Sequence, residues 1–201
     1  QFAHGELAEA LFDGLLRGKL ADVDPKLLYP AIRAVARNPD GMARARLRHT
    51  FEKLLTEDDV RALAPDILAA VHTRAPADTM FGNAIRMAGL KVLAKYRFRE
   101  GIEAAVVFAK TQGGHGSQKR TGEIMKELVR YGSAAREAVP GLKELIREFN
   151  AQCARNEFPK GELNRERVAA VEEAIRAIEA ATDHPPLNSI APAPPRGAAA
   201  K

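Results

Sequence analysis

The chain of 201 residues has little cysteine and few aromatic residues, and both shortages narrow its possible functions. Its single cysteine, Cys153, excludes an intramolecular disulfide and a cysteine-rich zinc site. It has no tryptophan, eight phenylalanines and three tyrosines, so it offers little aromatic surface for stacking nucleobases. No apolar run approaches the ~20 residues that a membrane-spanning helix needs. We therefore expect no membrane span, and nucleic acid is a weak prospect as a partner.

Motifs for catalysis or metal binding are also missing. The five histidines have none of the spacings typical of metal ligands; they are His4, His49, His72, His115 and His184. Adjacent carboxylates occur at 58–59 and 172–173, but neighbours on a helix point about 100° apart and cannot hold a substrate between them. Cys153 has no activating histidine nearby in the sequence. The sequence therefore predicts a protein that is not an enzyme and that uses no metal or cofactor.

Apolar residues recur at helical spacing along most of the chain, and Ala, Leu, Glu, Arg and Lys favour helix over strand. The stripes predict an N-terminal helix near residues 7–16 and then four helical pairs, over about 25–55, 56–94, 99–131 and 133–178. Asp24-Pro25 and Thr56 with Asp59 are typical helix starts, and Ser133 is a third expected N-cap. We expect one all-α domain over residues 1–183.

Residues 184–201 form a tail rich in proline and alanine, which cannot be helical. The composition is typical of a polyproline-like linker. An unstructured terminus is the default expectation, and docking onto the helices is the alternative.

An internal repeat is the most informative feature of the sequence. Pro30, Pro65 and Pro140 fall at the same phase of the first helix of a pair, at spacings of 35 and 75, and Gly101 stands near the missing position. A proline inside a helix costs about 3 kcal/mol or more, so its recurrence indicates a shared bend. One pair cannot bury its apolar side alone, so stacking of the pairs would supply the core.

The segment 132–146, Gly-Ser-Ala-Ala-Arg-Glu-Ala-Val-Pro-Gly-Leu-Lys-Glu-Leu-Ile, resembles the first helix of a HEAT repeat. In that family small residues precede a proline and leucines follow at helical spacing. The resemblance covers about residues 25–148 and departs at Gly101 and over 151–164. It implies a HEAT-like α-solenoid of about four helical hairpins plus an N-terminal helix, used as a scaffold. Residues 80–90 are also similar to a helical C-terminal region of large, uncharacterised bacterial proteins, which implies one domain of a larger protein. The start at Gln1, without Met, also indicates a processed chain or a piece of a longer one.

Basic residues exceed acidic ones by 31 to 26, which gives a net charge of +5 and favours acidic partners. Six of them begin or line the second helices of the pairs and could form a basic face; they are Arg44, Arg48, Arg86, Lys119, Lys126 and Arg130. A solvated, ion-paired surface is the alternative interpretation. The glycine-rich loop 113–116, followed by Lys119 and Arg120, would be either an anion cradle or a flexible connection capped by Ser117.

These features predict a non-catalytic protein–protein interaction or scaffolding domain. Its expected partners are another protein or other domains of the parent chain. The alternative is an anion-binding module for nucleic acid or acidic polysaccharide that uses the basic face. The sequence holds no determinant of compartment or of oligomeric state.

Overall fold

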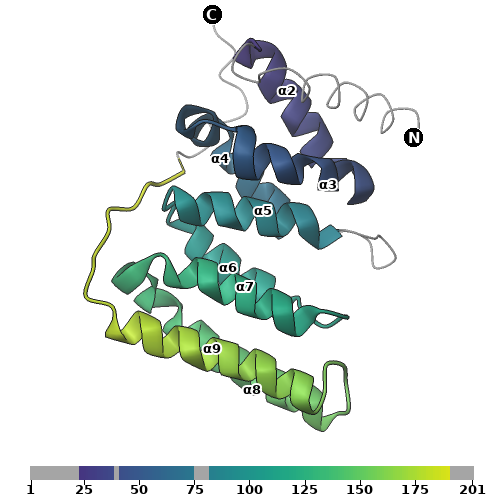
Figure 1. Cartoon of the computed structure of the whole chain (residues 1–201), viewed down its shortest axis with the longest axis vertical. Coiled ribbons are helices and arrows are strands. Elements are labelled where there is room, and N and C mark those ends of the chain that lie inside the picture. Colours follow the sequence, from purple (N-terminus) through teal and green to yellow (C-terminus); the bar gives the residue numbers. More distant parts are fainter. Residues whose placement is uncertain (1–22, 39–40, 75–81, 191–201) are drawn as a thin grey trace, which may run out of the picture.

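The computed structural model describes residues 23–38, 41–74 and 82–190, and this part of the chain is built from helices (Figure 1). The all-α prediction is confirmed for these residues. Their one β-type contact is an isolated parallel bridge between Phe98 and Asn188. Within the same ranges, no helix combines the length and the apolar character needed to cross a membrane. The predicted N-terminal helix over residues 7–16 lies outside the described residues.

Eight α-helices follow one another in the described ranges. They are α2 (Pro25–Ala36), α3 (Gly41–His49), α4 (Glu57–His72), α5 (Gly82–Lys95), α6 (Glu100–Lys110), α7 (Ser117–Val129), α8 (Val139–Ala154) and α9 (Glu162–Ala180). A π-helical turn, Thr50–Leu54, ends α3, and a 3₁₀ segment, Gly132–Ala138, leads into α8.

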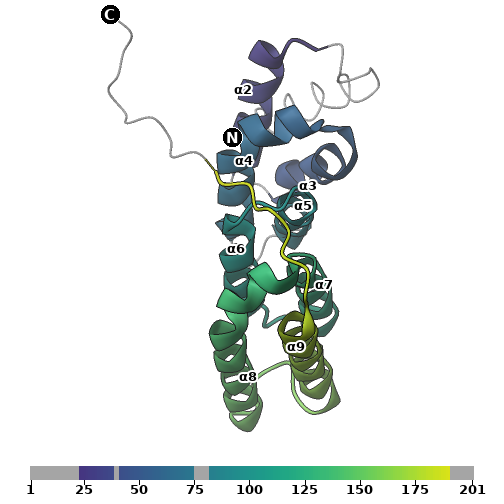
Figure 2. The same ribbon diagram turned by 90° about the vertical axis from the view of Figure 1, so that its left-hand side faces the viewer.

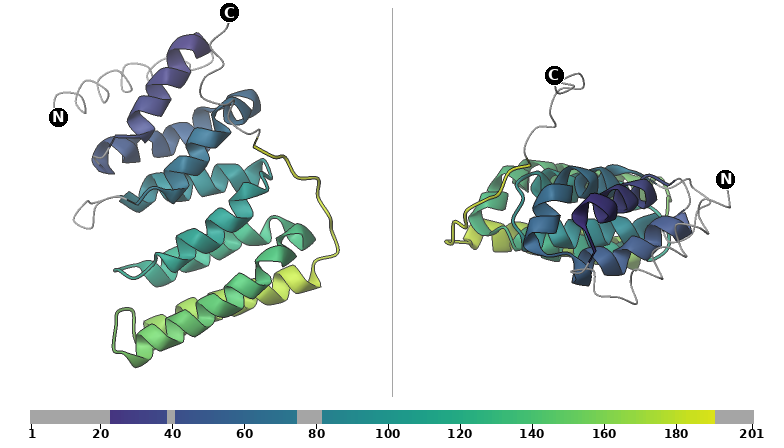
Figure 3. Two further views of the ribbon diagram at one scale, coloured as in Figure 1. Left: turned by 180° about the vertical axis from the view of Figure 1, so that it is seen from behind. Right: turned by 90° about the horizontal axis from the view of Figure 1, so that it is seen from above.

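The helices lie in two layers (Figure 2). The even-numbered helices α2 to α8 pack in sequence as a first layer, and the odd-numbered helices α3 to α9 as a second. Each first-layer helix also packs on the second-layer helix that follows it. In Figure 1 the second layer faces the viewer, and in the left view of Figure 3, turned by 180°, the first layer does. The loops that follow the first-layer helices lie at one edge of the stack, which we call the loop edge. We call the opposite edge the strap edge.

The predicted helix starts are confirmed at two of three positions. The Asp24 carboxylate accepts from the backbone N–H of Lys26, with Pro25 as the first helical residue. Thr56 and Asp59 form a reciprocal capping box at α4. The expectation for Ser133 was wrong, because this residue lies in the 3₁₀ segment and its hydroxyl donates to the Asp183 carbonyl instead (2.6 Å).

The predicted proline positions are likewise found at two of three places. Pro30 and Pro65 lie inside α2 and α4, as predicted, but Pro140 is the second residue of α8, where a missing N–H costs little. The glycine at position 101, where the repeat would place a proline, has a different explanation. A Cβ at this position would collide with the Tyr131 hydroxyl, which donates to the Phe98 carbonyl (3.0 Å).

Residues 181–190 leave α9 as an extended strap that runs back along the strap edge to the α5–α6 junction (Figures 1 and 2). Pro185 is buried, and Leu187 and Ile190 pack against the helical core. The structure therefore shows residues 184–190 docked onto the helices, which was the alternative to an unstructured tail.

Candidate functional site

Two residues of the expected basic face are in the interior. Arg44 and Arg86 are only 1% and 3% exposed, so the prediction that they line a surface was wrong. Both guanidiniums point at the C-terminus of α4, whose last carbonyls have no partner within the helix. Arg44 donates to the carbonyls of Ala70 (3.3 Å) and Thr73 (3.2 Å), and Arg86 donates to the carbonyl of Val71 (2.7 Å).

Arg86 also joins three helices. Its guanidinium lies 4.0 Å from the centre of the Phe108 ring on α6 and donates to the Thr111 hydroxyl at the end of that helix (3.0 Å). Burial is the main reason that the pKa of Arg86 falls to about 10, which leaves it charged at neutral pH. The negative end of the α4 dipole stabilises this charge.

Arg120 and Arg167 repeat the arrangement farther along the stack. Arg120 donates to the Gln112 side chain and to the His115 carbonyl, each at 2.8 Å. Arg167 is fully buried and donates to the carbonyls of Gln112 (3.1 Å) and Phe149 (3.4 Å). Its guanidinium lies 3.7 Å from the centre of the Phe149 ring.

We call Arg44, Arg86, Arg120 and Arg167 the arginine series. One member stands in the first half of each second-layer helix, and all of them serve helix C-termini or loops at the loop edge. Sequence reasoning missed the capping role throughout and missed Arg167 altogether. Apolar neighbours in the sequence could not have singled the series out, since Arg46 and Arg176 also have apolar neighbours on both sides and are exposed.

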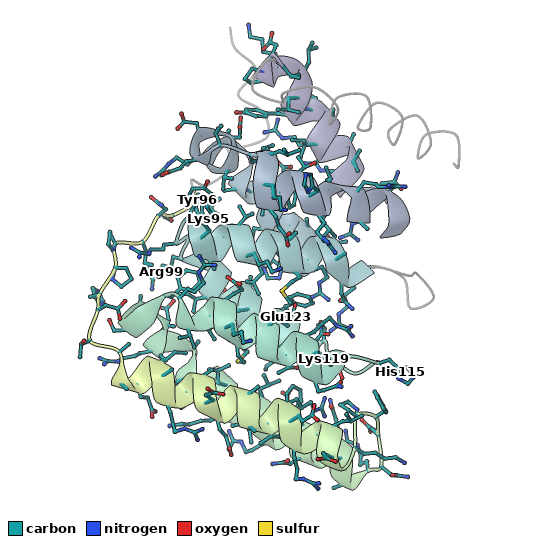
Figure 4. All side chains as sticks on the ribbon, viewed as in Figure 1. Lys95, Tyr96, Arg99, His115, Lys119 and Glu123 are labelled. Carbon is teal, nitrogen blue, oxygen red and sulfur yellow. The ribbon has the colours of Figure 1, made fainter. Side chains whose placement is uncertain are left out.

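The other four residues of the expected face are exposed. They are Arg48 on α3, Lys119 and Lys126 on α7, and Arg130 at the end of α7. Arg130 pairs with Glu127 (2.9 Å). Figure 4 shows Glu123 on the same helix as Lys119, four residues on. The exposed face is therefore smaller than predicted and mixed in sign.

A shallow groove separates α7 from α9 on the second layer. Its volume is about 280 Å³, and its lining consists mostly of small and apolar side chains with one lysine and one glutamate: Gly122, Met125, Lys126, Val129, Ala170, Glu173, Ala174 and Ala177. A second groove, of about 250 Å³, lies on the first layer beside Val106 and Gly141. Both volumes are small for a drug-sized ligand.

The glycine-rich loop is held in place by Arg120 of the following helix, α7. Gly116 has a left-handed backbone (φ +71°), and Arg120 reaches back to the His115 carbonyl. The His115 ring packs against Phe158, with 4.8 Å between the ring centres. Figure 4 shows His115 at this end of the molecule, beside Lys119. Arg120, which an anion cradle would need, is used by the loop itself.

The described residues contain no group of three or more His, Cys, Asp or Glu side chains placed to hold a metal ion. Tyr29 donates to Asp59 (2.8 Å), and burial together with this carboxylate raises its pKa to about 12. Burial likewise raises the pKa of Tyr131. Glu172 and Glu173 are exposed, as expected for a solvated face.

Comparison of the chain with protein-family models, with curated proteins and with solved structures gives no match in any of the three.

Proposed function

We propose that this chain is a protein-interaction or scaffolding domain, built as a HEAT-like solenoid and belonging to a larger protein. Three features support the solenoid. Helices pair in sequence, each pair packs on the next, and a capping arginine recurs at a similar position in each second-layer helix. Such stacks expose long faces that suit extended partners.

The observation that carries the proposal is the groove between α7 and α9. Small side chains at Gly122, Ala170 and Ala177 leave room for the side chains of a partner, while Lys126 and Glu173 offer charges of both signs. An apolar centre with a charged rim is the usual anatomy of a protein interface.

One observation favours anion binding as a second function. Arg48, Lys119 and Lys126 are exposed, and none of them has a hydrogen-bond or ion-pair partner among the described residues. Their charge is therefore available to an acidic polymer, whose binding would fall steeply with salt.

One capture experiment tests both functions. The purified chain is incubated with native lysate at low and at physiological salt, beside the variant Ala177→Arg and its control Ala62→Arg, an exposed alanine on α4. We expect proteins retained at physiological salt by the wild type and the control, but lost with Ala177→Arg. Retention of only nucleic acid or acidic polymers, released as salt rises, would instead support anion binding.

A further inference from the structure

The strap is held at its far end by the residue Asn188, whose backbone and side chain are both bound. Its N–H donates to the Arg97 carbonyl and its carbonyl accepts from the Arg99 N–H, each at 2.9 Å. Its side-chain amide donates to the Tyr96 carbonyl (2.7 Å), and its side-chain oxygen accepts from Arg61 (3.0 Å). Aspartate at this position would lack the amide donor, and alanine would lack both side-chain bonds.

The receiving loop is shaped for this residue. Arg97 has a left-handed backbone (φ +54°), which is uncommon outside glycine and costs about 1 kcal/mol or more. This turn lets the Tyr96 and Arg97 carbonyls both accept from Asn188. Glu100 extends the site by accepting from the Ile190 N–H and the Ser189 hydroxyl, each at 3.0 Å. The backbone bonds of Asn188 form an isolated parallel bridge with Phe98, the same kind of main-chain pairing that an extended peptide makes at a sheet edge.

The near end of the strap is anchored separately. Ser133 donates to the Asp183 carbonyl through its N–H (3.1 Å) and its hydroxyl (2.6 Å). Between the two anchors, residues 185–187 make no hydrogen bond with any other described residue. Pro185 is buried and Leu187 and Ile190 pack against the core, so release of the Asn188 end would expose these apolar side chains but would break no hydrogen bond within a helix.

The surface around the site carries charges of both signs. Lys95, Arg97 and Arg99 are exposed, Arg99 pairs with Glu137 (2.9 Å), and Figure 4 shows Lys95, Tyr96 and Arg99 beside the strap. Residues 185–190, which lead to this surface, contain no charged residue. The site thus fits an extended backbone with an asparagine side chain and an aliphatic residue on each side of it.

We propose that the strap edge is a binding site for an extended peptide of a partner protein, with the pattern Leu-Asn-polar-aliphatic, and that residues 183–190 occupy it in cis as a competitor. This inference rests on the proposed function, since it names one class of protein partner. The cis segment raises its own local concentration by its tether to α9, so a partner must outcompete it or bind after its release.

The test uses the full chain with Asn188→Ala and a labelled peptide, Asp-His-Pro-Pro-Leu-Asn-Ser-Ile, that copies residues 183–190. Fluorescence anisotropy should show the peptide binding this variant at least about tenfold more tightly than it binds the wild type, whose site is filled. The same peptide with alanine in place of asparagine should bind about tenfold more weakly, because two hydrogen bonds are lost. Hydrogen exchange at the Arg99 amide should speed up in the variant and slow again when the peptide is added.

Three outcomes would overturn the proposal. Unchanged protection of the Arg99 amide in the variant would mean that Asn188 is not the anchor. A freed site that binds neither peptide would make the strap purely structural. A concentration-dependent dimer of the wild type that Asn188→Ala abolishes would assign the site to a second copy of the chain. None of these depends on the groove between α7 and α9, so lysate proteins that the wild type and Asn188→Ala retain equally would leave the proposed function standing.

Discussion

The ends of the first-layer helices are bound by groups of opposite charge at the two edges of the stack, arginines at one edge and carboxylates at the other. At the loop edge, free carbonyls at the ends of α4 and α6 receive hydrogen bonds from the arginine series. At the strap edge, carboxylates stand at the helix N-termini, with Asp24 at α2, Asp59 at α4 and Glu100 at α6. Both arrangements agree with the helix dipole, whose N-terminal end is positive and whose C-terminal end is negative.

The edges differ in burial and in the origin of their partners. At the loop edge, Arg44, Arg86 and Arg167 are buried and bond to the same or the neighbouring hairpin. At the strap edge, Arg61 and Ser189 are exposed, and Asn188 comes from 92 residues beyond the Tyr96 carbonyl that it contacts. Buried caps contribute stability, whereas exposed bonds open at low free energy and can be exchanged. The loop edge therefore holds neighbouring helices together through buried groups, whereas the strap edge depends on partly exposed contacts between residues that are far apart in the sequence.

The largest expected effect comes from breaking the loop edge at Arg167. Arg167→Ala leaves the Gln112 and Phe149 carbonyls without this donor and removes the guanidinium that covers the Phe149 ring. The Gln112 carbonyl loses its donor, which costs about 1–3 kcal/mol, and the packing of the large side chain on Phe149 is lost as well, so the free energy of unfolding should fall by about 3–5 kcal/mol. Urea unfolding followed by circular dichroism measures it.

Arg165→Ala is the matched control, because Arg165 is exposed on the same helix. We expect it to change the free energy of unfolding by no more than about 0.5 kcal/mol. Equal stability of the two variants would show that the buried arginine contributes nothing as a cap.

A smaller effect is expected at the strap edge from Gly101→Ala. Alanine raises helix propensity by about 1 kcal/mol, but its Cβ would collide with the Tyr131 hydroxyl. We expect a net loss of about 1–3 kcal/mol in thermal or urea unfolding. The control is Gly122→Ala, where the nearest atom would be the Ala170 Cβ at 3.9 Å, so stability should be unchanged or higher.

A double-mutant cycle separates this collision from a general fault in α6. Tyr131→Phe removes the colliding oxygen along with its bond to the Phe98 carbonyl. The double variant Gly101→Ala/Tyr131→Phe should therefore lose less stability than the sum of the single variants. Strict additivity would place the cost of Gly101→Ala elsewhere.

The helices were predictable because their signals are local. Apolar spacing, the N-cap at Asp24 and the capping box at Thr56 depend on residues within one or two turns, and all of them are found in the structure. The arginine series could not be assigned in this way. Arginine is mostly a surface residue, so Arg44 and Arg86 were placed outside. Their acceptors belong to another helix, α4, and become apparent only when the two helices are packed together.

The strap was unpredictable for a related reason. A proline-rich segment forms no hydrogen bonds within itself, so its sequence carries no local sign of order. Its partners, Tyr96, Arg97 and Glu100, lie about 90 residues earlier in the chain. The same applies to Gly101, which filled a repeat position usually held by proline for a reason that only Tyr131 explains.

The smallest expected effect is the pH dependence of stability that comes from Asp59, the carboxylate at the N-terminus of α4 on the strap edge. Burial alone would raise the pKa of Asp59, but hydrogen bonds from Thr56 and Tyr29 outweigh burial and lower it. A pKa that is lower in the folded state gives stability that is present above the unfolded value, near 3.9, and is lost as pH falls through the folded value. Tyr29→Phe removes one of these bonds.

Tyr29→Phe should therefore lower the free energy of unfolding by about 1 kcal/mol at pH 7, and the deficit should shrink as the pH falls through the lowered pKa of Asp59 and this carboxylate takes up a proton. Melting curves of both proteins at pH 7 and pH 3 measure the difference. Tyr96→Phe is the control, because the Tyr96 hydroxyl has no hydrogen-bond partner among the described residues. A deficit that is the same at both pH values would mean that Tyr29 acts through packing on the core and not through the charge of Asp59. The strap edge would then depend less on its carboxylates than the loop edge depends on its arginines.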